Sequence, residues 1–385
     1  MLRPFVSRAP LRLALASLRS APPLRRTLAT TTTASTSGDD RFVKIVEVSP
    51  RDGLQNEKAV VPTEVKLELI RRLGQTGLRI IEAGAFVSPK WVPQMGDTPQ
   101  LLRSLGSSLS SSPSSSSFSS SSSSSSFSAG ADISYPVLVP NEKGLSSLQS
   151  LLQAVPKAQR APTDEIAIFT AASESFCRAN TNCSIQQSLE RLERVTSAAL
   201  ASGLRVRGYV STVAGCPYEG DIDPARVGDV SKALLDMGCY EVSLGDTIGV
   251  GTPAKMEEVL NVSLQKSGRR ADAFAAHCHN TFSTGLANVL HLVRLGVRTV
   301  DSSVGGLGGC PYSPGATGNI DTESVVFALH REGYHTGTDL GALAEIGDWI
   351  TAQIGRSQNA SNTGRALLAK KRLEQSKTSQ PAAKL

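Results

Sequence analysis

The sequence predicts an α/β protein of the (β/α)8 TIM-barrel class with an additional C-terminal helix, and three observations predict it. Short runs of β-branched and apolar residues alternate with longer amphipathic segments, eight such pairs fit between residues 39 and 356, and polar side chains gather where several runs end. Alternating strands and helices are typical of a parallel sheet covered by helices, and eight repeats can close that sheet into a barrel. Catalytic groups of such barrels lie at the carboxyl ends of the strands.

The elements follow in chain order. Apolar runs predict strands at 44–48, 78–82, 134–139, 165–169, 205–210, 240–244, 274–278 and 298–302, and amphipathic patterns predict helices at 63–76, 95–105, 142–154, 184–202, 223–237, 253–267, 281–295 and 321–332, with the additional helix at 338–354. Ser184, with Gln187 three residues later, forms a capping box at one helix start. A doubly wound open sheet is the competing fold, but its glycine-rich phosphate turn would follow the first strand, where the sequence has SPRDGLQNE (49–57) instead.

The N-terminal segment 1–38 has the composition of a mitochondrial transit peptide, with a disordered basic tail as the alternative. It holds six arginines, is rich in serine and threonine, and contains no acidic residue. The rest of the chain carries 34 basic and 34 acidic side chains, so the net charge of +6 belongs to this segment, and nucleic acid is not expected as a partner. No apolar run is long enough to span a membrane, so no membrane partner is expected.

Two further segments fall outside the predicted barrel elements. Residues 104–128 contain 19 serines in 25 positions, and we expect a disordered insertion over 104–130 because such a segment cannot bury a core. Residues 357–385 are expected to form a C-terminal tail whose last three residues, Ala-Lys-Leu, resemble the Ser-Lys-Leu peroxisomal signal. We therefore expect localisation in the mitochondrial matrix, with the peroxisome as a second destination.

The stretch AFAAHCHNTF (273–282) predicts a metal site. His277 and His279 are two residues apart at the end of a predicted strand, where side chains two apart point the same way. Two neutral imidazoles can bind a divalent metal, and a pair of hydrogen-bonded core histidines is the structural alternative. A closed zinc site is not expected, because Cys278 points to the opposite face and no cysteine pair completes the ligand set.

Oxygen ligands are predicted at two other strand ends. Asp52 follows the first strand, which neighbours strands seven and eight once the barrel closes. Asn319 lies in the loop after strand eight, although Gly-Asn is also an ordinary turn sequence. Two nitrogens and two oxygens favour Mg²⁺ or Mn²⁺ over zinc.

The same rim predicts catalytic and substrate-binding residues. Arg51, beside Asp52, can stabilise a developing oxyanion, with an Arg–Asp surface pair as the alternative. Glu82, at the end of strand two, can orient Arg51. Tyr209 and Asp246 end strands five and six and are predicted, together with Arg51, to contact the substrate.

Four glycines at positions 305–309 precede Cys310. This composition predicts a mobile loop that closes over a bound substrate, excludes water and brings the thiol of Cys310 to the site. A glycine-rich turn with an incidental cysteine is the alternative interpretation.

Six motifs together resemble the 3-hydroxy-3-methylglutaryl-CoA lyase family: SPRDGLQNE (49–57), IEAGAFVSPKWVPQMGD (81–97), RGYVSTVAGCPYEG (207–220), SLGDTIGVGTP (243–253), HCHNTF (277–282) and GLGGCPYSPGATGN (306–319). The resemblance runs from about residue 43 to residue 356, interrupted by the serine-rich segment. It implies a (β/α)8 metallolyase that cleaves its CoA thioester to acetyl-CoA and acetoacetate in leucine catabolism and ketone body formation. It also implies CoA thioester binding, and we expect a homodimer.

The resemblance assigns roles to residues already selected. The family's metal ligands match Asp52, His277, His279 and Asn319, and its catalytic residues match Arg51, Glu82 and Cys310. In the implied mechanism, His277 or Asp52 removes the proton of the substrate's tertiary hydroxyl, Arg51 stabilises the enolate, and Cys310 or a water protonates the carbon. The family often has Asp and Ala where this chain has Asn280 and Gly305, and neither position is a ligand.

Two alternative functions are open. A condensing enzyme of the isopropylmalate- or homocitrate-synthase type shares the Asp/His/His site on the same barrel, but it typically carries a long C-terminal regulatory region, which we do not expect here. A catalytically inactive barrel that serves as a serine-rich interaction scaffold would show no metal-dependent activity, and the intact ligand set argues against it.

Overall fold

The strands form where the sequence predicts them. The computed structural model describes residues 40–110, 133–156, 161–309 and 318–379. Within these ranges the barrel strands are β1 (Lys44–Glu47), β2 (Ile80–Ile81), β3 (Gly84–Ala85), β4 (Val137–Leu138), β5 (Glu165–Ala171), β6 (Arg205–Ser211), β9 (Glu241–Asp246), β10 (Phe274–Cys278) and β11 (Thr299–Ser302). They pair in parallel in the order β2-β1-β11-β10-β9-β6-β5-β4-β3. A separate antiparallel pair, β7 (Gly215–Cys216) and β8 (Gly220–Asp221), follows β6.

β2 and β3 close the sheet into a barrel because they are two halves of one chain segment. β2 pairs with β1, and β3 pairs with β4. Between them, the amide of Glu82 donates to the carbonyl of Glu47 at 2.9 Å, and the amide of Ala83 donates to the carbonyl of Pro136 at 2.9 Å. The nine strands of the sheet therefore correspond to eight barrel strands. The predicted barrel is confirmed, and the open-sheet alternative is wrong.

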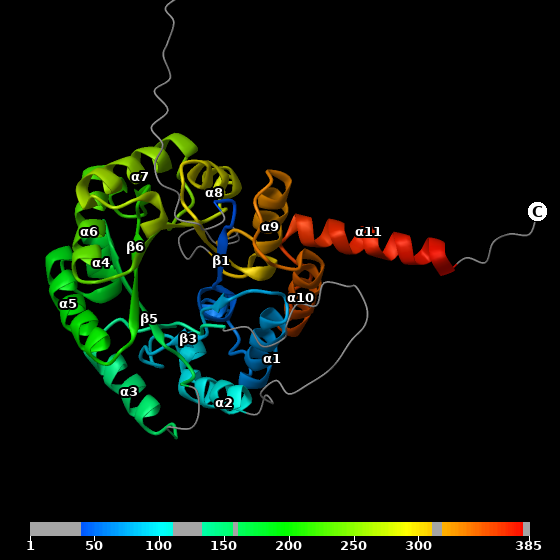
Figure 1. The fold of residues 1–385 in the computed structure, drawn as a ribbon, viewed down its shortest axis with the longest axis horizontal. Coiled ribbons are helices and arrows are strands. Elements are labelled where there is room, and N and C mark those ends of the chain that lie inside the picture. The colour runs from blue at the N-terminus through cyan, green and yellow to red at the C-terminus, as the bar shows by residue number, and fades with distance from the viewer. Residues whose placement is uncertain (1–39, 111–132, 157–160, 310–317, 380–385) are drawn as a thin grey trace, which may run out of the picture. The chain divides into compact units, whose positions relative to one another are not determined.

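Helices surround the strands (Figure 1). They are α1 (Thr63–Gly74), α2 (Thr98–Ser110), α3 (Glu142–Gln153), α4 (Glu174–Thr181), α5 (Ile185–Ala201), α6 (Pro224–Asp236), α7 (Pro253–Ser267), α8 (Gly285–Arg294), α9 (Thr322–Arg331), α10 (Leu340–Gln353) and α11 (Asn362–Ser379). The predicted capping box starts α5, where the hydroxyl of Ser184 accepts from the Gln187 amide and the Gln187 side chain accepts from the Ser184 amide. α11 extends outward beyond α10 (Figure 1).

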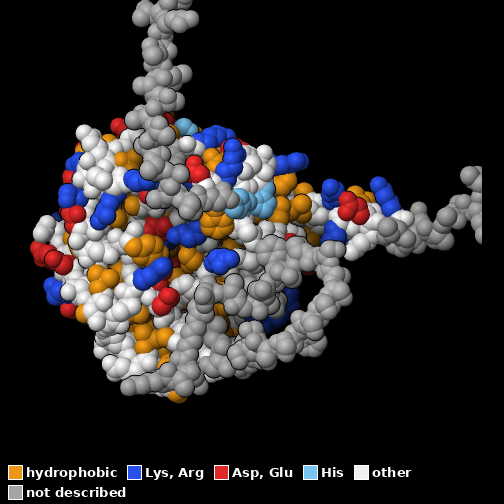
Figure 2. Space-filling view, viewed as in Figure 1, with side chains coloured by type: hydrophobic (Ala, Val, Ile, Leu, Met, Phe, Trp, Pro, Cys, Tyr) orange, Lys and Arg blue, Asp and Glu red, His pale blue; other side chains and the backbone are white. Residues whose placement is uncertain are grey.

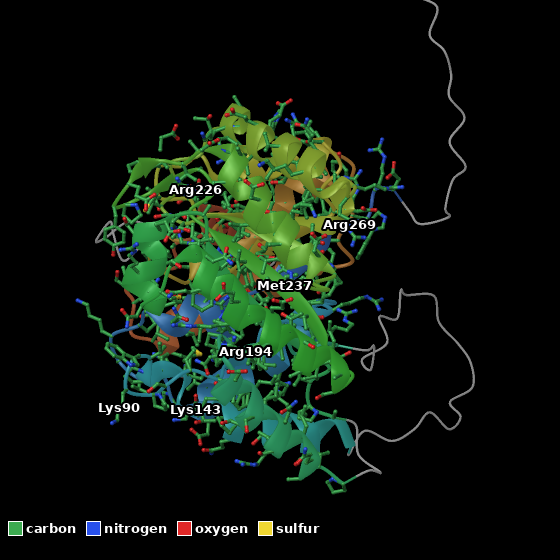
Figure 3. The ribbon with its side chains drawn as sticks, turned by 90° about the vertical axis from the view of Figure 1, so that its left-hand side faces the viewer. Lys90, Lys143, Arg194, Arg226, Met237 and Arg269 are labelled. Carbon is green, nitrogen blue, oxygen red and sulfur yellow. The ribbon has the colours of Figure 1, made fainter. Side chains whose placement is uncertain are left out.

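The direction of the strands distinguishes the two ends of the barrel. Lys90 lies in the loop after β3, and Arg226 lies in the first turn of α6, so both belong to the carboxyl end of the strands. Arg269 follows α7 and belongs to the opposite end. The side view places Lys90 and Arg226 toward one side of the barrel and Arg269 toward the other (Figure 3). Basic and acidic side chains are interspersed on the face shown in Figure 2.

Alternating strand residues divide between an apolar outer layer and a charged interior. In β6, Val206 and Val210 are buried in the hydrophobic core that the helices share. Arg207 and Tyr209 point the other way, because side chains alternate along a strand, and Arg207 contacts Asp301 of β11 across the interior. Barrel interiors are usually filled by branched apolar residues. Here much of the interior is occupied by ion-paired side chains.

The structure corrects the sequence prediction at two segments. α2 continues to Ser110, so disorder is wrongly predicted for residues 104–110; buried Leu101, Leu102 and Leu105 give this helix an apolar face. Residues 357–385 are not simply a tail, because α11 occupies most of them. The rest of the predicted insertion and the predicted transit peptide, 1–38, lie outside the described residues apart from their boundaries. Among the described residues, no helix has the length and apolar content needed to cross a membrane.

Candidate metal centre and active site

A π-helical turn after β1 places Arg51 and Asp52 at the rim. The turn spans Ser49–Gly53, with Pro50 near its start. The buried carboxylate of Glu47 accepts hydrogen bonds from the amide of Ser49 at 3.0 Å and from the amide of Val304 at 2.9 Å, which anchors the turn to the loop after β11. Short π-helical segments are frequent at functional sites. This turn gives two adjacent charged residues a fixed position beside β10 and β11.

Asp52, His277 and His279 converge as predicted. Each offers one ligand atom, and the three atoms lie within 4.8 Å of one another. Asp52 Oδ2 is 4.0 Å from His277 Nε2, and the two imidazole rings are 5.5 Å apart between centroids. The histidines share a face because they are two residues apart at the end of β10, and Asp52 joins them because β11 lies between β10 and β1.

An unsatisfied atom of this cluster suits a divalent cation. His279 Nδ1 is buried and has no hydrogen-bond partner among the described residues. A buried polar atom without a partner is costly unless something else binds it. One carboxylate and two imidazoles that meet at one point supply the donors that a divalent transition metal or magnesium accepts in proteins.

Asn319 joins the cluster in a different way from the prediction. Its Nδ2 donates to Asp52 Oδ2 at 2.8 Å and to the carbonyl of Leu307 at 3.3 Å, so the amide nitrogen rather than the predicted oxygen faces Asp52. A half turn about the last side-chain bond exchanges the two atoms. Gly308, with φ of +119°, leaves room for Asn319, because a Cβ there would lie 2.8 Å from Nδ2.

The electrostatics keep Asp52 and His279 in the form that binds cations. Burial alone would raise the pKa of Asp52, but Arg51, His277 and His279 lower it to about 2. Burial, assisted by His277, lowers the pKa of His279 to about 4. Burial opposes protonation of His277 as well, but the hydrogen bond and charge of Asp301 raise its pKa. At neutral pH, Asp52 is therefore ionised and His279 is neutral, which are the states that ligate metal.

Arg51 is held between two carboxylates. Its Nη1 lies 2.6 Å from Asp52 Oδ1, and its Nε donates to Glu82 Oε2 at 2.9 Å. Burial disfavours the charged guanidinium, but Glu82 and Asp52 more than offset this and raise the pKa of Arg51. The hydrogen bond from Arg51 to Glu82 therefore accounts for the predicted orientation of Arg51 by Glu82. Arg51 is a fixed cation next to the metal-binding cluster.

Tyr209 and Asp246, both predicted to contact substrate, have different surroundings. The Tyr209 hydroxyl accepts from Arg207 Nη1 at 2.8 Å and donates to Glu82 Oε2 at 3.4 Å, inside the barrel below Arg51. Asp246 is fully buried, and its two oxygens accept from the amides of Val250 at 3.2 Å and Gly251 at 2.9 Å. The structure therefore favours a loop-anchoring role for Asp246 over the predicted substrate contact.

Cys310 lies outside the described residues, so the prediction for its thiol remains a prediction. The loop that leads to it is described as far as Gly309. Gly305, Gly306 and Gly308 all have positive φ, at 66°, 60° and 119°. These conformations are readily available only to glycine, which explains the composition of the loop.

Sequence reasoning missed the residues beneath the cluster. Asp301 of β11 forms a hydrogen bond with His277, with 3.2 Å between Oδ2 and Nδ1. Arg207 Nη2 donates to Asp301 Oδ1 at 2.7 Å. Arg207 also donates to Glu241 Oε1 at 2.7 Å. The pattern that could have revealed them is a charged residue in the middle of a predicted strand, where a buried charge requires a partner.

A parallel barrel whose carboxyl rim gathers an aspartate and two histidines around one point belongs to the class of metal-dependent barrel enzymes. The HMGL-like family matches residues 42–350. The chain belongs to this family.

The relatives include lyases from two compartments. The mitochondrial hydroxymethylglutaryl-CoA lyase of Bos taurus is 47% identical over 336 residues, which cover 86% of this chain and 93% of that protein. A cytoplasmic 3-hydroxy-3-methylglutaryl-CoA lyase of Danio rerio is also 47% identical, over 83% of this chain and 85% of the relative.

Solved structures of hydroxymethylglutaryl-CoA lyases share the fold of this chain. The hydroxymethylglutaryl-CoA lyase of Pseudomonas aeruginosa is 41% identical with a TM-score of 0.74, covering 86% of this chain and 98% of that one. A lyase from Acinetobacter baumannii, solved with coenzyme A and 3-methylmalate, is 31% identical with a TM-score of 0.71, covering 86% and 96%.

Proposed function

We propose that this chain is a metal-dependent carbon–carbon lyase that cleaves 3-hydroxy-3-methylglutaryl-CoA to acetyl-CoA and acetoacetate. Membership of the HMGL-like family and the lyases among its relatives support this function. The structural observation that carries it is the convergence of Asp52, His277 and His279 beside the ion-paired Arg51.

Asp52, His277 and His279 would hold the divalent cation, and Asn319 can join them once its amide oxygen faces the cluster. Mg²⁺ or Mn²⁺ suits a mixed oxygen and nitrogen donor set with positions left for substrate. When bound, such an ion supplies Lewis-acid polarisation, which makes a tertiary hydroxyl more acidic.

The surrounding residues account for the remaining steps. Asp52, 4.0 Å from His277 Nε2, takes the proton of the hydroxyl as the carbon–carbon bond breaks, because an imidazole whose Nε2 binds the ion has no lone pair left to accept it. The electron pair of that bond moves to the thioester oxygen, and Arg51, a fixed cation held by Glu82, stabilises the resulting enolate. Protonation of the carbon then completes acetyl-CoA, and we assign this proton to Cys310.

The role of Cys310 can be separated from metal binding. Cys310→Ser should lower kcat by at least about 10²-fold, as expected for loss of a general acid, while the Mn²⁺ Kd stays within about threefold of wild type because no metal ligand changes. Turnover measured by acetoacetate formation and binding measured by calorimetry test the two parts. Unchanged turnover would remove Cys310 from the mechanism.

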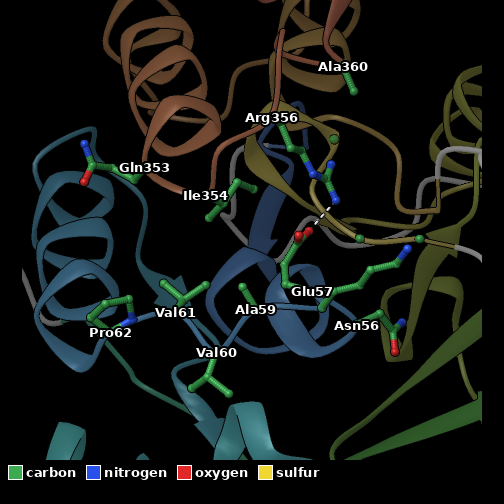
Figure 4. Close-up of a pocket in the computed structure, with 14 residues that line it drawn as sticks. Asn56, Glu57, Ala59, Val60, Val61, Pro62, Gln353, Ile354, Arg356 and Ala360 are labelled. Carbon is green, nitrogen blue, oxygen red and sulfur yellow. Dashed lines mark hydrogen bonds and ion pairs between the residues drawn. The ribbon is translucent and has the colours of Figure 1, made fainter.

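A cavity at the rim is suited to the CoA part of the substrate. It has a volume of about 790 Å³ and lies between the loop after β1, the glycine loop at 306–309 and the connection from α10 to α11 (Figure 4). Lys58 and Arg356 line it, and Arg356 pairs with Glu57. Basic side chains can bind the phosphates of CoA, and the glycine loop connects this cavity to the metal-binding cluster.

The decisive experiment is an assay of the purified full chain with 3-hydroxy-3-methylglutaryl-CoA. We expect acetoacetate and acetyl-CoA in equal amounts with Mg²⁺ or Mn²⁺ and no product with excess chelator. Acetyl-CoA with a 2-oxo acid serves as the control for a condensing synthase and should release no free CoA. Product formation that is insensitive to chelator would contradict the metal-dependent mechanism.

Location and assembly are further proposals. We infer the mitochondrial matrix from residues 1–38 and the peroxisome, secondarily, from the C-terminal Ala-Lys-Leu. Fluorescent fusions with either segment removed test each destination separately. We also propose a homodimer, which light scattering on the purified chain would check; a monomeric mass at micromolar concentration would contradict it.

A further inference from the structure

A chain of alternating charges crosses the barrel interior and ends at the metal-binding cluster. Lys44 Nζ lies 3.0 Å from Glu241 Oε2, and Arg207 Nε donates to Glu241 Oε1 at 2.7 Å. Arg207 Nη2 donates to Asp301 Oδ1 at 2.7 Å, and Asp301 Oδ2 lies 3.2 Å from His277 Nδ1. Each member comes from a different strand, so only the closed barrel brings them together.

We propose that Asp301 is a positioning residue for the metal centre: it accepts the Nδ1–H of His277, which leaves Nε2 without a proton and facing Asp52. The geometry supports this assignment because His277 Nε2, on the other side of the ring, is the atom 4.0 Å from Asp52 Oδ2. An imidazole carries one exchangeable proton when neutral, so fixing it on Nδ1 makes Nε2 the metal-binding atom. This inference rests on the proposed metal site.

Asp301 is itself held rigidly enough to orient a ring. Its Oδ2 accepts from Ser243 Oγ at 2.7 Å and from Arg207 Nη1 at 3.2 Å, in addition to its contact with His277. The carboxylate is fully buried, so water does not compete for its oxygens. It is therefore an acceptor fixed toward Nδ1.

His279 provides an internal contrast. Its Nδ1 is the ring atom without a partner, and the hydrogen bond to its ring involves the backbone of Thr247, so among the described residues no carboxylate orients this ring. If a carboxylate behind the ring fixes one histidine and not the other, the contribution of Asp301 to metal affinity should act through His277 alone. Carboxylates that orient a metal-bound histidine typically contribute 10- to 100-fold in affinity.

A purely structural role for Asp301 is the competing explanation, because it also neutralises Arg207. Asp301→Asn leaves that arginine with Glu241 as its only carboxylate partner among the described residues, and a buried cation that loses one of its partners destabilises a fold. The double variant Asp301→Asn with Arg207→Met removes both charges. It therefore keeps the interior neutral while still lacking the carboxylate behind His277.

The experiment measures the Kd of Mn²⁺ for the full chain by calorimetry, with folding of each variant checked by circular dichroism. We expect Asp301→Asn and the double variant to raise the Kd about 10- to 100-fold. In a His277→Asn background, Asp301→Asn should change the Kd less than about twofold, because the residue through which it acts is gone. Lys44→Met, at the far end of the chain of charges, is the matched control and should leave the Kd unchanged.

Several results would overturn the inference. A Kd for Asp301→Asn within twofold of wild type would do so. Recovery of wild-type affinity in the double variant would assign the effect to the charge of Arg207 instead. An equal loss in the His277→Asn background would show that Asp301 does not act through His277. Absence of Mn²⁺ binding by wild type would overturn the metal site and this inference together, whereas normal Mn²⁺ results without cleavage of the thioester would overturn only the proposed reaction.

Discussion

Arg51 owes its position to the carboxylates that surround it. The guanidinium lies between Asp52 and Glu82 and over the ring of Tyr209, with 5.6 Å from Cζ to the ring centroid. A planar guanidinium can satisfy two carboxylates and a ring at once, whereas a lysine ammonium is a single point charge. The position therefore requires arginine and not simply a cation.

Arg51→Lys keeps the positive charge at this position but changes the geometry of its hydrogen-bond donors. We expect kcat to fall about 10²-fold or more, because a misplaced donor no longer stabilises the enolate oxygen, while the Mn²⁺ Kd changes less than about threefold because Asp52 stays ionised. Steady-state kinetics and calorimetry provide the two readouts. Arg205→Lys, at the opposite end of the barrel, is the control that should show neither change. A wild-type kcat in Arg51→Lys would exclude the proposed role.

His279 makes the metal-free protein sensitive to acid. The unfolded chain protonates this residue near its ordinary pKa of 6.5, whereas burial, assisted by His277, lowers the folded value to about 4. Its contribution to stability is complete above pH 6.5 and falls as the pH drops toward 4, because protonation then favours the unfolded chain. His277 has the opposite sign, so the comparison must be between wild type and a His279 variant.

Between pH 7.5 and pH 5, we expect the unfolding free energy of wild type to fall by about 2 kcal/mol more than that of His279→Asn. Urea unfolding in the presence of chelator measures the difference. Equal losses in the two proteins would show that His279 is not buried as a neutral ring.

Two glycines in the loop after β11 differ in whether alanine can replace them. Gly308→Ala should cost about 1–3 kcal/mol of stability, because alanine is strained at a φ of +119° and its Cβ would press on Asn319. The Mn²⁺ Kd should also rise, since Asn319 is displaced from Asp52. Gly309→Ala is the matched control, because a Cβ there meets nothing within 4 Å. Denaturant unfolding and calorimetry check both; equal effects at the two positions would contradict this account.

The strands and most helices could be predicted because their periodicity is strong, but three elements could not. The second strand divides at Glu82 because it must pair with β1 on one side and β4 on the other, and this depends on closure rather than on local sequence. α4 has only eight residues, too few for its apolar pattern to repeat, and α11 is exposed over its outer half, so it lacks an apolar stripe to detect.

The rim residues of the site could be predicted, whereas the residues beneath them could not. His277 and His279 are recognisable because their spacing is local. The pairing of Arg207 with Asp301 depends on the register of strands that are distant in sequence, so a charged residue in a strand indicates a partner but does not identify it. Asp246 could be located at a strand end from the sequence, but its role could not be predicted. Its position does not reveal that its carboxylate accepts hydrogen bonds from the loop that follows it.

For the molecule as a whole, metal binding should add to folding stability because the cluster joins strands from both ends of the barrel sequence. At a free Mn²⁺ concentration 100 times the Kd, the unfolding free energy should rise by about 2.7 kcal/mol. Denaturant titrations with Mn²⁺ and with chelator measure the difference. Asp52→Asn should gain much less, and an equal gain in that variant would place the stabilising ion elsewhere.

The wide separation of Asp52 and His277 along the sequence has a consequence for how the protein acquires its ion. A ribosome releases Asp52 long before the β10 histidines emerge, and β1 meets β11 only after nearly the whole barrel has been synthesised. A chain threaded in extended form through a translocation pore would likewise arrive with these groups apart. Loading would then follow the final ring closure, so the metal supply of the destination compartment, rather than that of the site of synthesis, would determine which ion the mature enzyme carries.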